Sequence, residues 1–151
     1  MTIGTCEGSA RVVGAKGAAC ADLPRPNPGL TLRDGPNRRV LCCAGPHFAL
    51  QRWTLRQPHA EPSHPERFVI LSNVGDSWVD IEYEGGSETL GRAESCILPA
   101  SIGEARVVPD AAGEASLVAC YVPDLRRDVI EPLREAGYAD EEILSLGEVR
   151  V

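Results

Sequence analysis

The stretch Phe68–Pro99, FVILSNVGDSWVDIEYEGGSETLGRAESCILP, decides the fold that we expect of this chain. In its middle, Val79, Ile81 and Tyr83 alternate with acidic residues. A period of two sends the apolar side chains to one face of a sheet and the acids to water. Gly85-Gly86 predicts a tight turn, because glycine reaches positive φ without a Cβ clash. Three strands joined by tight turns indicate a small antiparallel β-barrel.

Further strands are predicted on both sides of this stretch, at residues 39–43, 48–55, 106–108 and 115–122. Within 48–55 the apolar residues change phase at Gln51-Arg52, which predicts a β-bulge there. The segment Gln57–Arg67 contains three prolines and two histidines, and we expect it to be a loop.

The C-terminal part changes its period from two to that of a helix. Four apolar residues share one helix face, and they are Leu125, Val129, Ile130 and Leu133. Asp124 is suited to begin this helix and Gly137 to end it. A second short helix is predicted to start with Asp140 as its cap and to direct Ile143, Leu144 and Leu146 inward. We expect both helices to pack across the open end or side of the barrel.

The chain of 151 residues has the length of one domain. Residues 1–28 are poor in large apolar side chains, and the prolines at 24, 26 and 28 enforce extended backbone. We therefore predict a tail or linker over residues 1–28 and a mainly β domain over residues 29–151.

Composition excludes several classes of protein. The net charge of −7 argues against nucleic acid as a partner, since phosphate neutralisation needs a basic face. No run of about 18 apolar residues occurs, so no membrane span is expected. The six cysteines form no CxxC pair, and no basic and apolar leader begins the chain. We expect a reduced, cytoplasmic protein.

Five segments, taken in order, resemble the C-terminal cupin domain of class I mannose-6-phosphate isomerases, most closely the short bacterial type. They are VLCCAGPHFALQRWTL, FVILSNVGDSWVDIEYEG, LGRAESCILPASIGEARV, ACYVPDLRRDVIEPLREAGY and EEILSLG. The resemblance covers about residues 29–146 and implies a cupin-type, or jelly-roll, antiparallel barrel. It also implies a cytoplasmic, zinc-dependent enzyme that interconverts mannose 6-phosphate and fructose 6-phosphate. In that family the zinc ligands lie in a preceding cupin half, and no residue here matches one of them.

The candidate metal ligands of this chain are His59, His64 and Glu66. Imidazoles and a carboxylate suit zinc, iron or manganese. A metal-binding cupin has two histidines one residue apart on one strand, whereas His59 and His64 are five apart in a proline-rich segment. We therefore expect no metal in this chain and exposed loop positions for these residues, with a small metal-dependent cupin enzyme as an alternative.

Other polar and aromatic residues have ordinary structural explanations. His47 is expected to pack at a strand start, and Ser95 and Ser101 lack a neighbouring histidine and acid for nucleophilic catalysis. Asp80, Glu82 and Glu84 fit the solvated face of a strand better than a catalytic pair. Trp53 and Trp78 are expected in the core rather than as sugar-binding platforms.

The leading functional hypothesis is an isomerase-related domain that lacks the metal-bearing half and is inactive alone, either as a remnant or as the C-terminal partner of a separate metal-bearing chain. An alternative is a module that binds a sugar or sugar phosphate. Its anion would then meet one of four arginines, Arg52, Arg67, Arg92 or Arg106, because guanidinium groups suit phosphate. A cupin without its covalent partner exposes apolar surface, so we also predict a homodimer.

Overall fold

A computed structural model describes residues 29–62, 64–111 and 113–150 of the chain. The tail or linker predicted for residues 1–28 lies outside these residues. None of the helices in the described part is long and apolar enough to cross a membrane.

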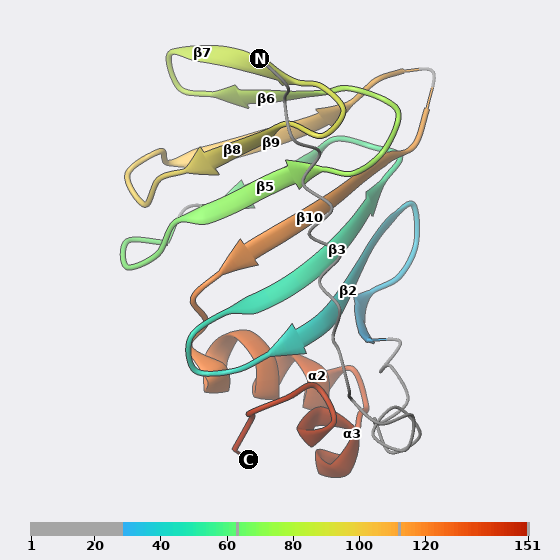
Figure 1. The fold of residues 1–151 in the computed structure, drawn as a ribbon, viewed down its shortest axis with the longest axis vertical. Helices are drawn as coiled ribbons and strands as arrows, with labels where there is room; N and C mark the ends of the chain where they lie inside the picture. Colours follow the sequence, from blue (N-terminus) through green and yellow to red (C-terminus); the bar gives the residue numbers. More distant parts are fainter. Residues whose placement is uncertain (1–28, 63, 112, 151) are drawn as a thin grey trace, which may run out of the picture.

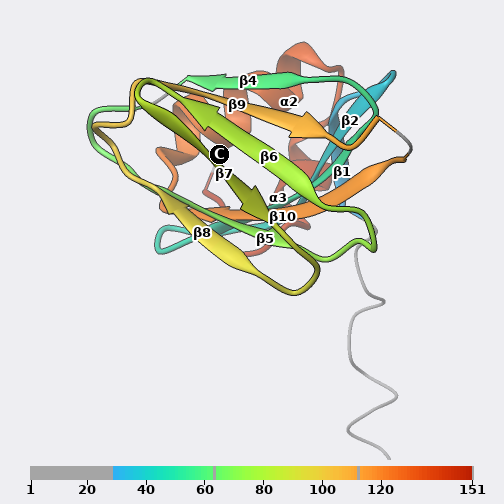
Figure 2. The same cartoon turned by 90° about the horizontal axis from the view of Figure 1, so that it is seen from above.

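The described residues form two antiparallel sheets that face each other, and Figure 2 shows β4 and β9 on one side and β5, β8 and β10 on the other. The six-stranded sheet has the order β1-β2-β3-β10-β5-β8, and the four-stranded sheet has the order β4-β9-β6-β7. The strands are β1 (Leu30–Arg33), β2 (Asn37–Ala44), β3 (Ala49–Leu55), β4 (His59–Pro62), β5 (Val69–Asn73), β6 (Val79–Tyr83), β7 (Gly86–Leu90), β8 (Ser95–Leu98), β9 (Glu104–Pro109) and β10 (Ala115–Tyr121).

The stretch Phe68–Pro99, with which the sequence analysis began, contributes strands to both sheets. Strand β5 lies in the six-stranded sheet, and β6 and β7 form a hairpin in the four-stranded one. The predicted glycine turn is confirmed, with Gly85 at φ 99 and Tyr83 paired to Gly86. The segment after the glycine turn was predicted as one strand, but it forms two strands, β7 and β8. A turn at residues 91–94, where the Gly91 amide donates to Glu94, carries the chain back to pair β8 with β5.

The core lies between the two sheets and comes from the alternating inward positions of their strands. The six-stranded sheet contributes fully buried side chains, among them Leu41, Leu55, Leu71 and Leu117. The other sheet contributes Val79, Ile81 and Val107, which are 0 to 2% exposed. The alternation predicted for Val79 and Ile81 is therefore confirmed.

The predicted bulge at Gln51-Arg52 is wrong. Strand β3 alternates without interruption, because Ala49, Gln51, Trp53 and Leu55 all face inward and are buried. The irregularity falls on β2, between Leu41 and Cys43. The apparent change of phase arose because Gln51 is a polar residue at a buried position.

The loop predicted for Gln57–Arg67 contains a strand, so this prediction is wrong as well. Strand β4 pairs with β9, with His59 opposite Val107 and Glu61 opposite Ala105. Its burial alternates, with His59 and Glu61 buried and Ala60 exposed. Pro62 ends the strand, which is an edge strand and therefore tolerates proline.

The C-terminal helices lie across one end of the barrel, beyond the ends of β2 and β10 (Figure 1). A π-helical turn η1 (Leu125–Ile130) continues into α2 (Glu131–Glu135), and α3 (Asp140–Leu144) follows. Asp124 caps the first helix by accepting from the Arg127 amide at 3.0 Å, as predicted. Gly137 follows α2 with φ 93, which suits the predicted end.

Two details of the second helix differ from the prediction. Its N-cap is Ala139, whose amide donates to Glu142, and Asp140 is the first helical residue. Ile143 and Leu146 are buried, but Leu144 is 43% exposed. The Leu146 carbonyl accepts from the Ala44 amide at 3.1 Å, which fixes this helical end against β2.

Candidate functional site

A cavity of about 390 Å³ opens at the helical end of the barrel, on the inner face of β2, β3 and β10. We call it the mouth cavity. Its polar lining comes from strands, from the segment after β4 and from η1. It consists of Arg33, Arg39, Gln51, Glu61, Arg67, Tyr121, Arg127 and Asp128. The helices position this lining because η1 carries Asp128 towards β10 and Arg67.

Gln51 is the centre of a buried hydrogen-bond network. Its side-chain oxygen accepts from Arg39 Nη2 at 2.7 Å, from Arg39 Nε at 3.1 Å and from Trp53 Nε1 at 2.9 Å. Those donors fix the orientation of the amide, so its nitrogen donates to the Tyr121 hydroxyl at 2.5 Å. The network explains why a glutamine that is only 3% exposed is tolerated in the interior.

Glu61 is held by two neighbours at the same carboxylate oxygen. Its Oε2 accepts from His59 Nε2 at 3.2 Å and from Arg39 Nη1 at 3.4 Å. His59 and Glu61 are 6% and 7% exposed, and the His59 ring meets the Trp53 ring edge to face with centroids 5.2 Å apart. The other oxygen, Oε1, forms no hydrogen bond with a described residue and is available to a hydroxyl group.

Arg67 reaches the same cavity from the segment after β4. Its Nη1 donates to Asp128 at 2.6 Å, and its guanidinium lies 4.6 Å from the centroid of the Tyr121 ring. Its Nε is buried and has no hydrogen-bond partner among the described residues. A buried donor without a partner is costly, but this nitrogen is enclosed by protein atoms, so a ligand would reach Arg67 through Nη2, which forms no hydrogen bond with a described residue.

Three groups of the cavity are shifted in pKa. The hydrogen bond to Asp128 raises the pKa of Arg127. Burial opposes ionisation of Asp128, but hydrogen bonds from Arg127 and the Asp124 amide, with the charge of Arg67, hold its pKa below the ordinary value. Burial raises the pKa of Tyr121, although Arg67, Arg39 and Gln51 oppose the shift. The Tyr121 hydroxyl therefore keeps its hydrogen at neutral pH and is available as a donor.

Positive charge is concentrated in this cavity. Four arginines line it against two carboxylates, although the whole chain carries a net charge of −7. The free groups are complementary to a polyhydroxylated anion. Arg67 Nη2 and the Tyr121 hydroxyl donate, and Glu61 Oε1 accepts.

The residues that the sequence singled out as metal ligands have different environments. His59 is buried in β4 and bonded to Glu61, whereas His64 accepts from the Glu66 amide in the turn that follows. No group of three or more histidine, cysteine, aspartate or glutamate side chains is placed to hold a metal ion in residues 29–62, 64–111 and 113–150. The expectation of exposed loop residues is wrong for His59 and correct for Glu66.

Of the four arginines proposed to meet an anion, only Arg67 lines the mouth cavity. Arg92 and Arg106 form exposed ion pairs with Asp76 at 2.9 Å and with Glu82 at 3.1 Å. Arg52 is exposed on the outer face of β3. Sequence reasoning missed Arg39, Gln51, Glu61, Tyr121 and Asp128. The one available signal was His59-Ala60-Glu61, whose two polar residues leave one face of a strand.

The remaining candidates are ordinary surface and core residues. His47 is exposed before β3 rather than packed, and Ser95 bonds to Ser72 at 2.7 Å. Trp53 is 1% exposed, as expected of a core residue, but Trp78 is 58% exposed, so its predicted burial is wrong. Glu82 and Glu84 are exposed and Asp80 is half-buried, which fits the solvated face of β6.

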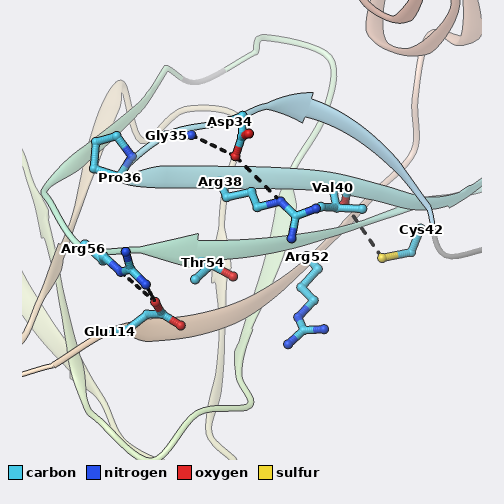
Figure 3. Close-up of a pocket in the computed structure, with 10 residues that line it drawn as sticks. All are labelled: Asp34, Gly35, Pro36, Arg38, Val40, Cys42, Arg52, Thr54, Arg56 and Glu114. Carbon is cyan, nitrogen blue, oxygen red and sulfur yellow. Dashed lines mark hydrogen bonds and ion pairs between the residues drawn. The ribbon is translucent and has the colours of Figure 1, made fainter. Parts of the chain in front are cut away.

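A second hollow lies on the outer face of β2 and β3 and is drawn in Figure 3. Its volume is about 500 Å³, but its charged side chains are exposed and mostly paired with each other. Arg56 meets Glu114 at 2.8 Å and Arg38 meets Asp34 at 3.9 Å. Such exposed pairs contribute little to stability. The mouth cavity, with its buried network, is therefore the candidate site.

The chain matches no protein-family model and no curated protein. Its structure nevertheless resembles several solved proteins. The mannose 6-phosphate isomerase of Bacillus subtilis aligns with a TM-score of 0.52 at 17% identity, over 65% of this chain and 29% of that one. An RmlC-like cupin of Shewanella frigidimarina aligns with a TM-score of 0.54 at 11% identity, over 71% and 93% of the two chains.

A third similar structure is Pac13 of Streptomyces, described as a nucleoside dehydratase. It aligns with a TM-score of 0.54 at 8% identity, over 66% of this chain and 79% of Pac13. At these identities the likeness shows the fold alone. The predicted cupin-type antiparallel barrel with two short C-terminal helices is confirmed, and this chain spans less than a third of the isomerase.

Proposed function

We propose that this chain is a cupin domain of the mannose-6-phosphate-isomerase type that binds a sugar phosphate in the mouth cavity and has no isomerase activity alone. The observation that carries the proposal is the surplus of four arginines over two carboxylates in one cavity of an acidic protein. Guanidinium groups recognise phosphate oxygens by charge and by paired hydrogen bonds.

The unused hydrogen-bonding groups support a sugar phosphate over a simple anion. Arg67 Nη2, which forms no hydrogen bond with a described residue, and the Tyr121 hydroxyl are donors for phosphate or carbonyl oxygens. Glu61 Oε1 is an acceptor for a sugar hydroxyl, since the Arg39 and His59 contacts both go to the other oxygen. A volume of about 390 Å³ lies within the range of small-molecule sites.

The residues present do not fit the zinc ion that the isomerase resemblance implies. A catalytic zinc site needs three protein ligands, and no group of three histidine, cysteine, aspartate or glutamate side chains among the described residues is placed to hold a metal ion. Arg39 donates to the carboxylate oxygen that His59 also contacts, and the Gln51 oxygen already accepts from Arg39 and Trp53. The proposal therefore assigns binding to this chain and leaves the metal-bearing half to a separate partner.

Titration calorimetry with the full chain tests the binding step. We expect heat with mannose 6-phosphate and fructose 6-phosphate, and little with mannose or inorganic phosphate. Arg67→Met should weaken binding about tenfold or more, because a charge-assisted hydrogen bond to phosphate is worth about 1.5–3 kcal/mol. Arg106→Met is the matched control, since Arg106 pairs with Glu82 on the surface.

Absence of heat with every sugar phosphate would refute the binding proposal, as would equal losses in both arginine variants. A separate isomerase assay with equimolar zinc tests the statement on activity. We expect no turnover. Turnover that survives chromatographic repurification would contradict the inactivity while leaving the binding proposal intact.

A further inference from the structure

The outer face of the six-stranded sheet carries two adjoining rows of apolar side chains, which we call the outer band. The first row crosses five strands as directly opposed pairs, and consists of Cys43, Leu50, Cys120, Ile70 and Ile97. The second row lies two residues further along four of these strands, and consists of Phe48, Val122, Phe68 and Pro99. This face of the sheet is turned towards the reader in Figure 1.

The outer band is open to solvent in the described structure. Phe48 and Val122 are each 52% exposed, Phe68 is 48% exposed and Ile97 is 62% exposed. These are four of the seven exposed large hydrophobic residues in the described part of the chain. Scattered surface hydrophobics are normal, but a contiguous apolar patch marks an interaction site.

The two borders of the outer band carry opposite charges. Arg52 lies beside the first row, in the register of Val118, and Figure 3 shows its guanidinium away from the neighbouring acids. Glu148 lies beyond the second row and shares a groove with Phe48 and Cys43. Neither Arg52 nor Glu148 forms an ion pair with a described residue, and both are exposed.

We propose that the outer band is the interface of a homodimer, in which two copies pack face to face about a twofold axis that runs along the band. A closed dimer of this kind uses one self-complementary patch on both subunits. The axis brings the first row of one copy against the second row of the other. It also brings Arg52 of each copy close to Glu148 of its partner, so that the two side chains form an ion pair.

The size of the band agrees with this arrangement. Five strands about 4.8 Å apart and two rows about 6.8 Å apart give an apolar centre of roughly 300 Å². The borders around Arg52 and Glu148 extend this area. A standard interface buries about 800 Å² on each partner. An apolar centre with a charged rim is the usual anatomy of such interfaces.

Size-exclusion chromatography with light scattering on the full chain, over a dilution series, tests the proposal. We expect twice the mass of the chain at high concentration and dissociation on dilution. Ile97→Lys should raise the dissociation constant about tenfold or more, since it places a charge in the apolar centre. Val74→Lys is the control, because Val74 is 56% exposed and lies outside the outer band.

A charge exchange tests the direction of the axis. Arg52→Glu should weaken the dimer, and combining it with Glu148→Arg should restore the wild-type dissociation constant. A monomer at every concentration would overturn the proposal, and so would a dimer that Ile97→Lys leaves unchanged. A double variant no tighter than Arg52→Glu would overturn the proposed axis. Sugar-phosphate binding is not involved in any of these readouts, because the mouth cavity lies on the other face of the sheet.

Discussion

The two faces of β2, β3 and β10 differ in a way that reverses the usual pattern of a half-buried sheet. The inner face at the helical end carries Arg39, Gln51 and Tyr121. The outer face at the same level carries Leu50 and Cys120, the immediate neighbours of Gln51 and Tyr121 in sequence. Polar groups are thus inside and apolar groups outside. Both departures mark surfaces that suit another molecule, a small polar one inside and a flat apolar one outside.

The two faces also differ in how much each side chain contributes to stability. The inner groups bond to one another, so removal of one leaves others buried without a partner. The outer groups are partly solvated already, so truncation changes little in the monomer. Substitutions that compare the two environments therefore test this account.

The largest difference is expected between the two tryptophans. Trp53 is 1% exposed and donates to Gln51, whereas Trp78 is 58% exposed. Trp53→Ala should lower the free energy of unfolding by about 3–5 kcal/mol, because it leaves a large cavity and removes one of the three donors to the Gln51 oxygen. Trp78→Ala should cost less than about 1 kcal/mol. Urea denaturation of both variants makes the comparison, and equal losses would contradict the burial of Trp53.

A smaller difference is expected between the adjacent residues Leu50 and Gln51. Gln51→Leu removes the partner of Arg39, Trp53 and Tyr121, and should lower the free energy of unfolding by about 2 kcal/mol. Leu50→Gln, on the outer face, should cost about 0.5 kcal/mol. The measurement belongs at a low protein concentration, where any dimer is dissociated. A stabilising Gln51→Leu would mean that the network is not formed.

The sequence predicts the strands well where hydrophobic and polar residues alternate, and poorly where a buried face is polar. Val79 and Ile81 were placed correctly because Asp80 and Glu82 alternate with them on the solvent-facing side of β6. Gln51 and the pair His59 and Glu61 were misplaced because a pattern of hydrophobicity cannot distinguish a buried, hydrogen-bonded polar group from an exposed one. That distinction depends on Arg39 and Tyr121, which are 12 and 70 residues from Gln51 in the chain.

The same limit explains why the candidate site was found only in part. Arg67 was among the predicted anion ligands because any arginine suits phosphate. Its selection over Arg92 and Arg106 depends on the position of η1, which brings Asp128 within 2.6 Å of Arg67 Nη1. The apolar residues of the outer band can be identified in the sequence, but their alignment in two rows follows from the strand register.

Lowering the pH should lower the free energy of unfolding, because it protonates Asp128 on the inner face. Its pKa in the folded chain lies below the ordinary 3.8, so its stabilising contribution is complete above pH 3.8 and is lost as the pH falls through the folded value. Asp128→Asn should lower the free energy of unfolding by about 1.5 kcal/mol at neutral pH. This difference from wild type should shrink below pH 3.8. A difference that stays constant down to pH 2 would show that the Asp128 charge is not what stabilises the end of the barrel.

The smallest effect is expected for the ion pair of Arg56 and Glu114 on the outer face. Their nitrogen and oxygen atoms are 2.8 Å apart, which is close to the 2.6 Å between Arg67 and Asp128, but their side chains are 68% and 44% exposed. Exposed pairs contribute about 0–1 kcal/mol and are screened by salt. Arg56→Met should therefore change the free energy of unfolding by about 0.3 kcal/mol, and less in high salt. A loss as large as that of Asp128→Asn would mean that distance alone sets the strength of these pairs. The contrast between the two faces would then come from geometry and not from burial.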